Sequence, residues 1–334
     1  MNSKPKGFSY QKTPYNYIAY YEDGKWSQGS LREDDTITIS SLSTALHYGQ
    51  QCFEGLKAYR RKDGRIQLFR VKDNAERFRQ SCQRMLMPQI SDETFINAIK
   101  EVVLANESFI PPYGTKETLY IRPFMIGVGA NLGLRAAPKY IFSVICSPVG
   151  SYFSGPAKPV HMLVSDYDRA APNGTGHVKV GGNYAASLYA QFIAKEQGYS
   201  DCIFLDPKTH TKIEEVGAAN FIGITKDGKY ITPKSQSILN SITNRSLRWL
   251  AQNKLGLEVI EGDIYIDQLD ILEEAGACGT AAVIAAIGSI TYNNKRHEFP
   301  TGDQMGKVMS QLNELLVGIQ FGDIEDPNDW VTIL

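Results

Sequence analysis

The stretch HVKVGGNYAAS, residues 177–187, places a lysine in surroundings that a surface lysine does not require. Lys179 lies between two valines, glycines stand on both sides of this short segment, and a helix is predicted to begin directly behind it. One interpretation is a lysine whose stem packs while its ammonium group reaches water. The other is an amine that forms a Schiff base with a carbonyl compound, because apolar surroundings lower the pKa of a lysine and glycines let a bulky ring approach the backbone.

The composition of the chain limits its class. With 334 residues two domains are expected, and 35 basic against 36 acidic residues argue against nucleic acid or a membrane surface as a partner. The most apolar run, residues 275–290, is shorter than a bilayer span, and the first residues lack the apolar segment of a signal peptide. The five cysteines form no CxxC pair and the five histidines no HExxH motif, so we expect no disulfide framework, no metal site and a cytoplasmic location.

The order of predicted elements indicates a mixed α/β (α+β) fold in two domains. A segment rich in Pro, Gly and Ser, residues 147–159, predicts an interdomain linker. It separates a smaller N-terminal α/β domain, residues 1–146, from a larger C-terminal domain, residues 160–334.

Turn and helix signals locate elements in the N-terminal domain. Asp-Gly pairs at residues 23–24 and 63–64 predict two β-hairpins, and TLYIRPFMIGV, residues 118–128, predicts a strand. Asp73 and Glu76 are spaced as a capping box, which predicts a helix start. The apolar stripe of that helix is predicted on Phe78, Cys82, Met85 and Leu86. In the C-terminal domain, helices are predicted over 183–198 and 241–256, each closed by a glycine.

One glycine-rich motif suggests a dinucleotide site but lacks its context. GVGANLG, residues 127–133, follows a predicted strand, yet its last glycine comes one residue too late and no helix follows, because the chain runs into Pro138. A turn is the better interpretation of this segment.

A Schiff-base lysine that serves pyridoxal phosphate needs partners for the cofactor's ring. An acid must face the pyridine nitrogen, and KIEEVGAAN offers Glu214 and Glu215, which point in opposite directions if the segment is extended. One of the two can then face a ring while the other faces water. Tyr184, on the first turn of the helix behind Lys179, can reach back to the phenolic oxygen. Each residue also has a purely structural interpretation, and only their joint occurrence favours the functional one.

The phosphate of such a cofactor needs a cation and backbone N–H groups, which a helix N-terminus supplies. Ser241 is a predicted N-cap, and the N–H groups of Ile242 and Thr243 behind it can hold a dianion. Arg77, near the start of an earlier helix, can supply the cation. An ordinary helix cap and a surface charge are the alternatives.

Taken in order, six motifs resemble those of branched-chain amino acid aminotransferases, which are class IV, fold type IV pyridoxal-phosphate enzymes. The resemblance runs from about residue 15 to the C-terminus, and the motifs are HYGQQCFEGLKAYR, LYIRPF, HVKVGGNYAAS, EEVGAANFIGIT, ILNSITNRSL and EAGACGTAA.

The resemblance implies a set of cofactor ligands. Lys179 looks like the Schiff-base lysine and proton shuttle, Tyr184 like the partner of the phenolic oxygen, and Glu215 like the partner of the pyridine nitrogen. The implied phosphate ligands are Arg77, Ser241, Ile242, Thr243 and Thr280.

The resemblance also implies a substrate pocket. Tyr48 and Phe53 look like walls of an apolar side-chain pocket. Tyr120 and Arg122 are two residues apart on a strand and so face the same side; in the family this pair orients substrate, and the arginine helps hold the second carboxylate of 2-oxoglutarate. Thr280 and Ala281 are implied to hold the α-carboxylate through their backbone N–H groups.

Some positions depart from the family pattern. The family tends to have an aromatic residue two positions after the asparagine that corresponds to Asn220, and this chain has Ile222 there, after Phe221. Asn244 stands where the family tends to have a basic residue. Mammalian relatives carry a CxxC pair where this chain has Ala282 and Ala285, so a thiol switch of that kind is not expected.

The resemblance therefore predicts a homodimeric transaminase, and the cysteine usage places it in the cytoplasm. It would transfer the amino group of L-leucine, L-isoleucine or L-valine to 2-oxoglutarate, giving the branched-chain 2-oxo acid and L-glutamate, with no nucleic-acid, membrane or metal partner. Within the fold type the alternatives are a D-amino acid aminotransferase and an aminodeoxychorismate lyase, which are generally shorter and tend to lack the YIRP strand. From another class, a catalytically silent scaffold or ligand-binding protein on the same fold remains open.

Overall fold

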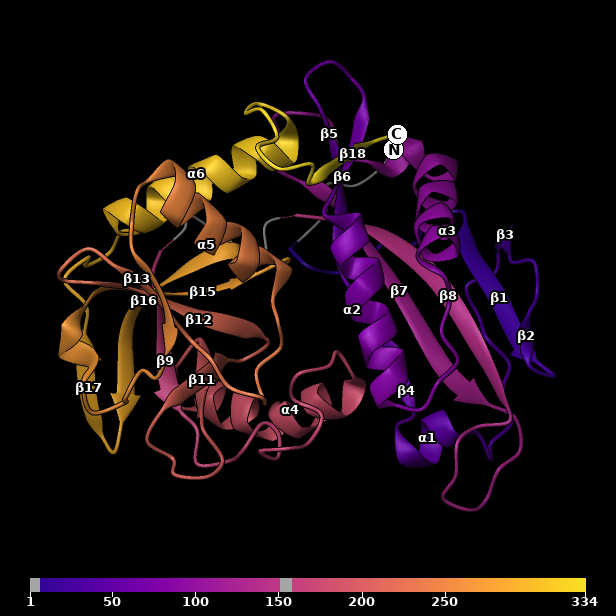
Figure 1. The fold of residues 1–334 in the computed structure, drawn as a ribbon, viewed down its shortest axis with the longest axis horizontal. Helices are drawn as coiled ribbons and strands as arrows, with labels where there is room; N and C mark the ends of the chain where they lie inside the picture. Colours follow the sequence, from indigo (N-terminus) through magenta and orange to yellow (C-terminus); the bar gives the residue numbers. More distant parts are fainter. Residues whose placement is uncertain (1–6, 151–157) are drawn as a thin grey trace. The chain divides into compact units, whose positions relative to one another are not determined.

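The structure is a computed structural model that describes residues 7–150 and 158–334 of the chain (Figure 1). The chain divides into two compact units, each a mixed α/β assembly as predicted. Unit 1 comprises residues 1–152, 178–181 and 319–334, and unit 2 comprises residues 153–177 and 182–318. Within the described ranges, none of the helices is long and apolar enough to cross a bilayer.

The sheet of unit 1 is antiparallel throughout its described pairs. Its main path runs in the order β18-β6-β5-β7-β8-β1-β2, with β3 beside β1 and β4 beside β7. The strands among the described residues are β1 (Asn16–Glu22), β2 (Lys25–Trp26), β3 (Ser30–Arg32), β4 (Gln51–Phe53), β5 (Leu56–Arg60), β6 (Ile66–Phe69), β7 (Thr118–Val128), β8 (Lys139–Val149) and β18 (Val331–Ile333). The strand predicted over residues 118–128 is β7, with the predicted bounds.

Both predicted hairpins are confirmed. Glu22 pairs with Lys25 across Asp23 and Gly24, and both turn residues have positive φ, 51° and 79°, as a two-residue type I′ turn requires. Strands β5 and β6 are joined by a longer loop in which Gly64 has φ 84°. An Asp-Gly pair predicts such turns because glycine enters the left-handed region without steric cost.

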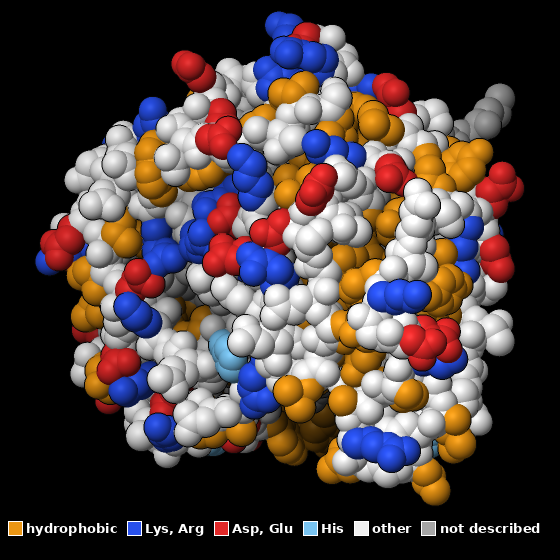
Figure 2. All heavy atoms as spheres, turned by 45° about the vertical axis from the view of Figure 1, so that its right-hand side comes forward, with side chains coloured by type: hydrophobic (Ala, Val, Ile, Leu, Met, Phe, Trp, Pro, Cys, Tyr) orange, Lys and Arg blue, Asp and Glu red, His pale blue; other side chains and the backbone are white. Residues whose placement is uncertain are grey.

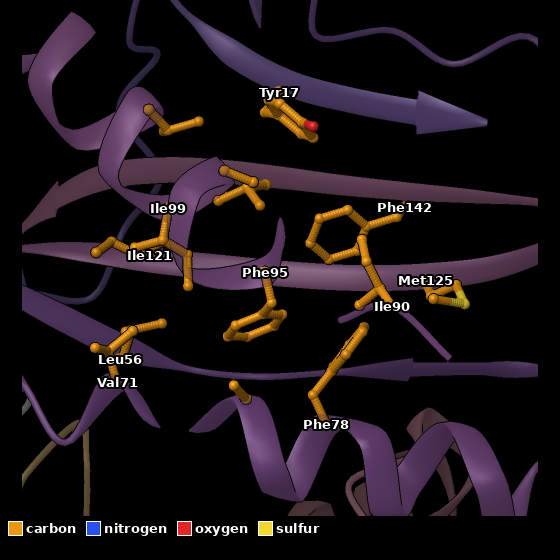
Figure 3. Close-up of a cluster of buried hydrophobic side chains, with 14 of the residues drawn as sticks. Tyr17, Leu56, Val71, Phe78, Ile90, Phe95, Ile99, Ile121, Met125 and Phe142 are labelled. Atoms are coloured by element: carbon orange, nitrogen blue, oxygen red, sulfur yellow. The ribbon is translucent and has the colours of Figure 1, made fainter. Parts of the chain in front are cut away.

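Two helices of unit 1, α2 (Val71–Arg84) and α3 (Asp92–Ala105), pack against one face of this sheet (Figure 1). The core between them contains a cluster of phenylalanines (Figure 3). Phe78 of α2 lies 5.1 Å from Phe95 of α3 and 5.7 Å from Phe142 of β8, measured between ring centroids. Aromatic contacts of this kind add to the free energy gained from burying the rings. Two shorter helical turns complete the unit, α1 (Thr44–Tyr48) and the 3₁₀ turn Glu107–Phe109.

The predicted capping box of α2 is wrong. The N-cap is Arg70, in the left-handed region with φ 54°, and its side chain makes no capping hydrogen bond to the helix. Asp73 instead accepts a hydrogen bond from the Nε of Arg70 at 2.8 Å, so this carboxylate is held in an ion pair. The predicted apolar stripe holds for Phe78 and Cys82, which are buried, but Leu86 lies beyond the helix and is 77% exposed.

In unit 2, six strands close into a ring, because β11 pairs with β10 on one side and with β12 on the other. The ring runs β11-β10-β9-β16-β15-β12, with β13, β14 and β17 attached outside it. The strands are β9 (Val160–Val164), β10 (Asp201–Leu205), β11 (Ile213–Val216), β12 (Ala219–Thr225), β13 (Tyr230–Pro233), β14 (Val259–Gly262), β15 (Leu272–Gly279), β16 (Val283–Tyr292) and β17 (Lys295–Glu298). Each of the six ring strands is therefore paired on both sides, so none of them is an edge strand. This pairing holds β11 and β15 in place, and site residues are predicted on β11 and just after β15.

Three helices follow in the sequence of this half of the chain: α4 (Gly181–Glu196), α5 (Ile242–Lys254) and α6 (Lys307–Phe321), with a 3₁₀ turn at Leu269–Ile271. The predicted helices over 183–198 and 241–256 are thus confirmed as α4 and α5. Gly198 and Gly256, the predicted closing residues, have φ 83° and 68°. Ser241 is the N-cap of α5.

The two units do not follow the expected domain limits everywhere. The linker expected over 147–159 begins inside strand β8, and residues 151–157 lie outside the described residues. Residues 178–181 and 319–334, expected in the C-terminal domain, group with unit 1. The last strand, β18, pairs with β6 of unit 1, so long-range strand pairing decides where the C-terminus belongs.

Basic and acidic side chains are interspersed over the face shown in Figure 2, in keeping with the nearly equal numbers of the two kinds in the sequence.

A buried carboxylate caps helix α6 and leads to a testable prediction. Glu274 of β15 accepts hydrogen bonds at 2.9 Å from the backbone N–H groups of both Val308 and Met309. A Cβ on Gly306 would collide with the Glu274 carboxyl group. We expect Gly306→Ala to lower the free energy of unfolding by about 1–2 kcal/mol, because it displaces this cap. Chemical denaturation measures this, with Gly133→Ala, whose Cβ would meet open space, as the control; equal stability of the two variants would contradict it.

Candidate active site

Lys179 is held by its backbone on two elements of unit 1. Its N–H donates to the Oγ of Ser81 on α2, and its carbonyl accepts from the N–H of Phe53 at the end of β4, both at 3.0 Å. Its neighbours Val178 and Val180 are buried, whereas Lys179 itself is half-buried. The apolar flanks that the sequence predicts therefore serve to dock this segment, and the lysine side chain emerges from it.

Three further residues gather around this lysine. The Nζ of Lys179 lies 4.8 Å from the ring centroid of Phe53, and the guanidinium carbon of Arg122 lies 4.7 Å from the same centroid. Arg122 donates to the hydroxyl of Tyr120 at 2.9 Å, and its buried Nε has no hydrogen-bond partner among the described residues. A buried guanidinium nitrogen without an acceptor is costly, so this cluster is suited to an incoming anion.

The glycine of the Phe53-Glu54-Gly55 segment is required by Tyr120. A Cβ on Gly55 would collide with the Tyr120 hydroxyl, so only glycine lets the tyrosine lie against this backbone. Gly55 thereby fixes the position of the hydroxyl that holds Arg122.

Arg77 forms a buried ion pair. Its guanidinium donates to both carboxylate oxygens of Glu54, at 2.7 and 2.9 Å, and Asn74 donates to the same carboxylate at 2.7 Å. Burial raises the pKa of Glu54, but Arg77, Lys179 and Asn74 outweigh this effect and lower the pKa below its ordinary value. The arginine predicted at the phosphate is therefore oriented by an acid that follows Phe53 directly in the sequence.

Tyr48 lies on α1 and is exposed, and its hydroxyl donates to the carbonyl of Leu132 at 2.6 Å. No described contact joins it to Phe53, Tyr120 or Arg122. The structure thus gathers Lys179, Phe53, Tyr120 and Arg122 and leaves Tyr48 apart from that group.

In unit 2, the two adjacent glutamates of β11 have different hydrogen-bond partners. Glu215 accepts from the N–H of Leu239 at 2.7 Å and lies 3.4 Å from the guanidinium of Arg169. Glu214 accepts from the hydroxyls of Ser235 and Ser237, each at 2.6 Å. The expectation that one of them faces water is wrong, because both are buried and Glu214 is 7% exposed.

The N-terminus of α5 has the arrangement predicted for an anion. The hydroxyl of Ser241 accepts from the N–H of Asn244 at 3.2 Å. The N–H groups of Ile242 and Thr243 have no acceptor among the described residues, so the positive end of the helix offers two donors. Asn244 also donates to Asn220 and Thr232, at 3.1 and 2.8 Å, which ties this helix start to β12 and β13.

Three further predicted residues lie in this half of the chain. Thr280 and Ala281 lie in the tight turn between β15 and β16, which ends at Val283 with φ 62°. A positive φ is uncommon for a β-branched residue, and such strain gathers at functional sites. Tyr184 lies half-buried on the first turn of α4.

Four residues that hold this site in place were not predicted. Ser81 and Glu54 fix Lys179 and Arg77, while Arg169 and Asn244 fix Glu215 and the start of α5. The sequence held a signal for Glu54, because this residue lies in the motif HYGQQCFEGLKAYR. The roles of Ser81, Arg169 and Asn244 are apparent only from their contacts in the folded chain. Among the described residues, no group of His, Cys, Asp and Glu is arranged to hold a metal ion.

Lys57 on β5 shares the face of the sheet that carries Tyr120, its cross-strand partner on β7. Burial lowers the pKa of Lys57 from 10.5 to about 8. Between these values the unfolded chain holds a proton that the folded chain has released, so the free energy of unfolding rises with pH across this window.

We expect Lys57→Met to be more stable than the wild type by roughly 1–3 kcal/mol below pH 8, because charging a buried amine is costly. The difference should shrink above pH 8 and vanish near pH 10.5. Urea unfolding of both proteins over this pH range measures it, and a difference that does not change with pH would contradict the assignment.

Comparison with known proteins gives a consistent result over nearly the whole chain. Residues 51–290 match the family model of amino-transferase class IV. The chain is 60% identical, over 97% of its length and 96% of the relative's, to the branched-chain-amino-acid aminotransferase of Haemophilus influenzae. Its fold is similar to that of the Escherichia coli branched-chain amino acid aminotransferase (TM-score 0.81, 26% identity, 96% and 99% of the two chains covered). It is also similar to the PLP-form of the Thermobaculum terrenum enzyme (TM-score 0.79, 26% identity, 97% and 99% covered). The chain therefore belongs to amino-transferase class IV.

Proposed function

We propose that this protein is a branched-chain amino acid aminotransferase. It moves the amino group of L-leucine, L-isoleucine or L-valine reversibly to 2-oxoglutarate, and releases the 2-oxo acid and L-glutamate. The observation that carries this is the cluster in unit 1, in which the amine of half-buried Lys179 and the guanidinium of Arg122 both lie over the ring of Phe53; the Nε of that guanidinium has no acceptor among the described residues. The 60% identity to the Haemophilus influenzae enzyme supports the same function.

The cofactor is pyridoxal 5′-phosphate, and the donors in the chain suit it. Two N–H groups at the start of α5, those of Ile242 and Thr243, suit a phosphate, as does the guanidinium of Arg77. The buried carboxylate of Glu215 suits a protonated ring nitrogen. When bound, the cofactor supplies an aldehyde carbon that takes up an amino group and a ring that accepts the electrons left by the α-proton.

Lys179 has two roles in this proposal. Its Nζ holds the cofactor between turnovers, and it removes the substrate's α-proton and keeps it for the return transfer. The carboxylate of Glu215 would supply negative charge to a protonated ring nitrogen, which would make the α-proton more acidic. Tyr184 donates to the phenolic oxygen, and the hydroxyls of Ser241 and Thr280 add donors for the phosphate.

The substrate residues divide by chemistry. Phe53 offers apolar surface to a branched side chain, and Tyr48 is added to this pocket by the sequence resemblance alone. The Nε of Arg122, which has no acceptor among the described residues, receives the second carboxylate of 2-oxoglutarate, and Tyr120 orients this arginine. A pocket of this kind accepts an aliphatic chain in one half-reaction and a carboxylate in the other. The backbone of Thr280 and Ala281 binds the α-carboxylate.

A D-amino acid aminotransferase is not favoured. The chain covers 96% of the length of a relative that is named for branched-chain amino acids, and it carries the YIRP strand as β7. A homodimer in the cytoplasm is part of the proposal; the sequence resemblance supports the homodimer, and the scattered cysteines without a CxxC pair support the location.

A steady-state assay of glutamate formation from 2-oxoglutarate tests the function. We expect kcat/KM for L-leucine, L-isoleucine and L-valine to exceed that for D-alanine by about 100-fold or more, because D-alanine cannot present its α-proton on the same side and fills little of the pocket. A preference for D-alanine would replace the proposal with the D-amino acid alternative.

A further inference from the structure

The backbone of Lys179 belongs to a closed circuit of contacts inside unit 1. Its N–H donates to the hydroxyl of Ser81 at 3.0 Å, and that hydroxyl donates to the carbonyl of Arg77 at 3.1 Å, one helical turn earlier on α2. The guanidinium of Arg77 is held by Glu54, and the next residue back in the chain, Phe53, donates its N–H to the carbonyl of Lys179 at 3.0 Å. The circuit therefore joins the amine, the cation and the apolar wall of the site.

Within this circuit, Ser81 forms hydrogen bonds with both Lys179 and Arg77. The proposed function assigns it no part in the reaction. Its side chain is fully buried. A hydroxyl that donates one hydrogen bond and accepts another has a fixed orientation, so Ser81 sets the distance between the backbones of Lys179 and Arg77. Both bonds have lengths in the ordinary range.

We propose that Ser81 is a positioning residue for transamination, one that keeps the backbone of Lys179 in place while its side chain is released and recaptured in each cycle. A released amine returns to the reacting carbon only if its main chain has not moved, and a shift of about 1 Å at a reacting group can cost 10²-fold in rate. This inference rests on the proposed role of Lys179.

A purely structural role for Ser81 predicts lost stability with unchanged chemistry, and the chain offers a matched control. Cys82, the next residue on α2, is also fully buried. Its Sγ lies 3.5 Å from the Sγ of Cys52, and no described contact joins it to Lys179. Cys82→Ala therefore disturbs the same helix without cutting the bond to the lysine.

The experiment compares Ser81→Ala, Ser81→Thr, Cys82→Ala and Lys179→Ala as cofactor-loaded proteins. We expect Ser81→Ala to retain cofactor, to lower kcat for L-leucine roughly 10-fold with KM changed less than about twofold, and to shift the pH midpoint of the cofactor's absorption band. Ser81→Thr, which keeps the hydroxyl, should restore both kcat and the midpoint. Cys82→Ala should lower the melting temperature and leave kcat and the midpoint as in the wild type.

The outcomes separate this inference from the function on which it rests. If Ser81→Ala matches Cys82→Ala in kcat and midpoint while Lys179→Ala is inactive, the positioning role is refuted and the proposed function stands. If Lys179→Ala keeps its turnover, the proposed function itself fails. Should Ser81→Ala not fold, Ser81→Cys replaces it: its weaker acceptor should give an intermediate kcat, and a wild-type kcat would refute the proposal.

Discussion

Replacing Lys179 with alanine is expected to lower kcat for L-leucine roughly 10⁴-fold, the upper end of what a positioned proton-transfer group contributes. Alanine removes the amine that lies over the Phe53 ring, so the group proposed to take the α-proton is lost. The fold should persist, because the bonds to Ser81 and Phe53 involve only backbone atoms of residue 179. Single-turnover kinetics and circular dichroism measure the two effects.

Lys212→Ala is the control for loss of a lysine, since Lys212 is paired with Asp263 in unit 2. It should keep the wild-type kcat. Turnover by Lys179→Ala within tenfold of the wild type would mean that another group carries the proton, and would also revive the scaffold interpretation of this fold.

The second large effect is expected at Glu215. Glu215→Gln keeps the size of the side chain but removes the charge opposite the ring nitrogen, and we expect kcat to fall by about 10²–10³-fold, as for the loss of other preorganised electrostatic partners. The glutamine can still accept a hydrogen bond from Leu239, so the local backbone should be retained. Pre-steady-state measurement of α-proton removal from deuterated L-leucine locates the loss in the chemical step.

The adjacent glutamate is a matched control, because it is equally buried on the same strand and has different partners. Glu214→Gln weakens the hydrogen bonds from Ser235 and Ser237, so we expect lower stability and a kcat within about threefold of the wild type. If Glu214→Gln loses activity and Glu215→Gln does not, Glu214 is the partner of the ring nitrogen, and the assignment of Glu215 to that role is wrong.

Much of the fold could be predicted from local signals. The bounds of β7, the turns at 23–24 and 63–64 and the ends of α4 and α5 all follow from residue types within a few positions of one another. These features depend on backbone sterics and apolar periodicity, which act over short distances in the sequence.

What could not be predicted depends on partners that are distant in the sequence or on competition between neighbours. Asp73 has the spacing of a cap, but Arg70 takes its carboxylate. Glu214 was expected to face water, but two serines more than twenty residues later enclose it. The bond from Lys179 to Ser81 spans 98 positions. No pattern around residue 179 indicates that contact, because it arises only when the segment docks on α2.

The most direct measurement is the absorption spectrum of the purified, cofactor-loaded protein as amino acids are added. We expect a yellow band that L-leucine bleaches and D-alanine does not, and that 2-oxoglutarate restores but pyruvate does not. A protein that stays colourless when pyridoxal phosphate is supplied, or a band that only D-alanine bleaches, would contradict it.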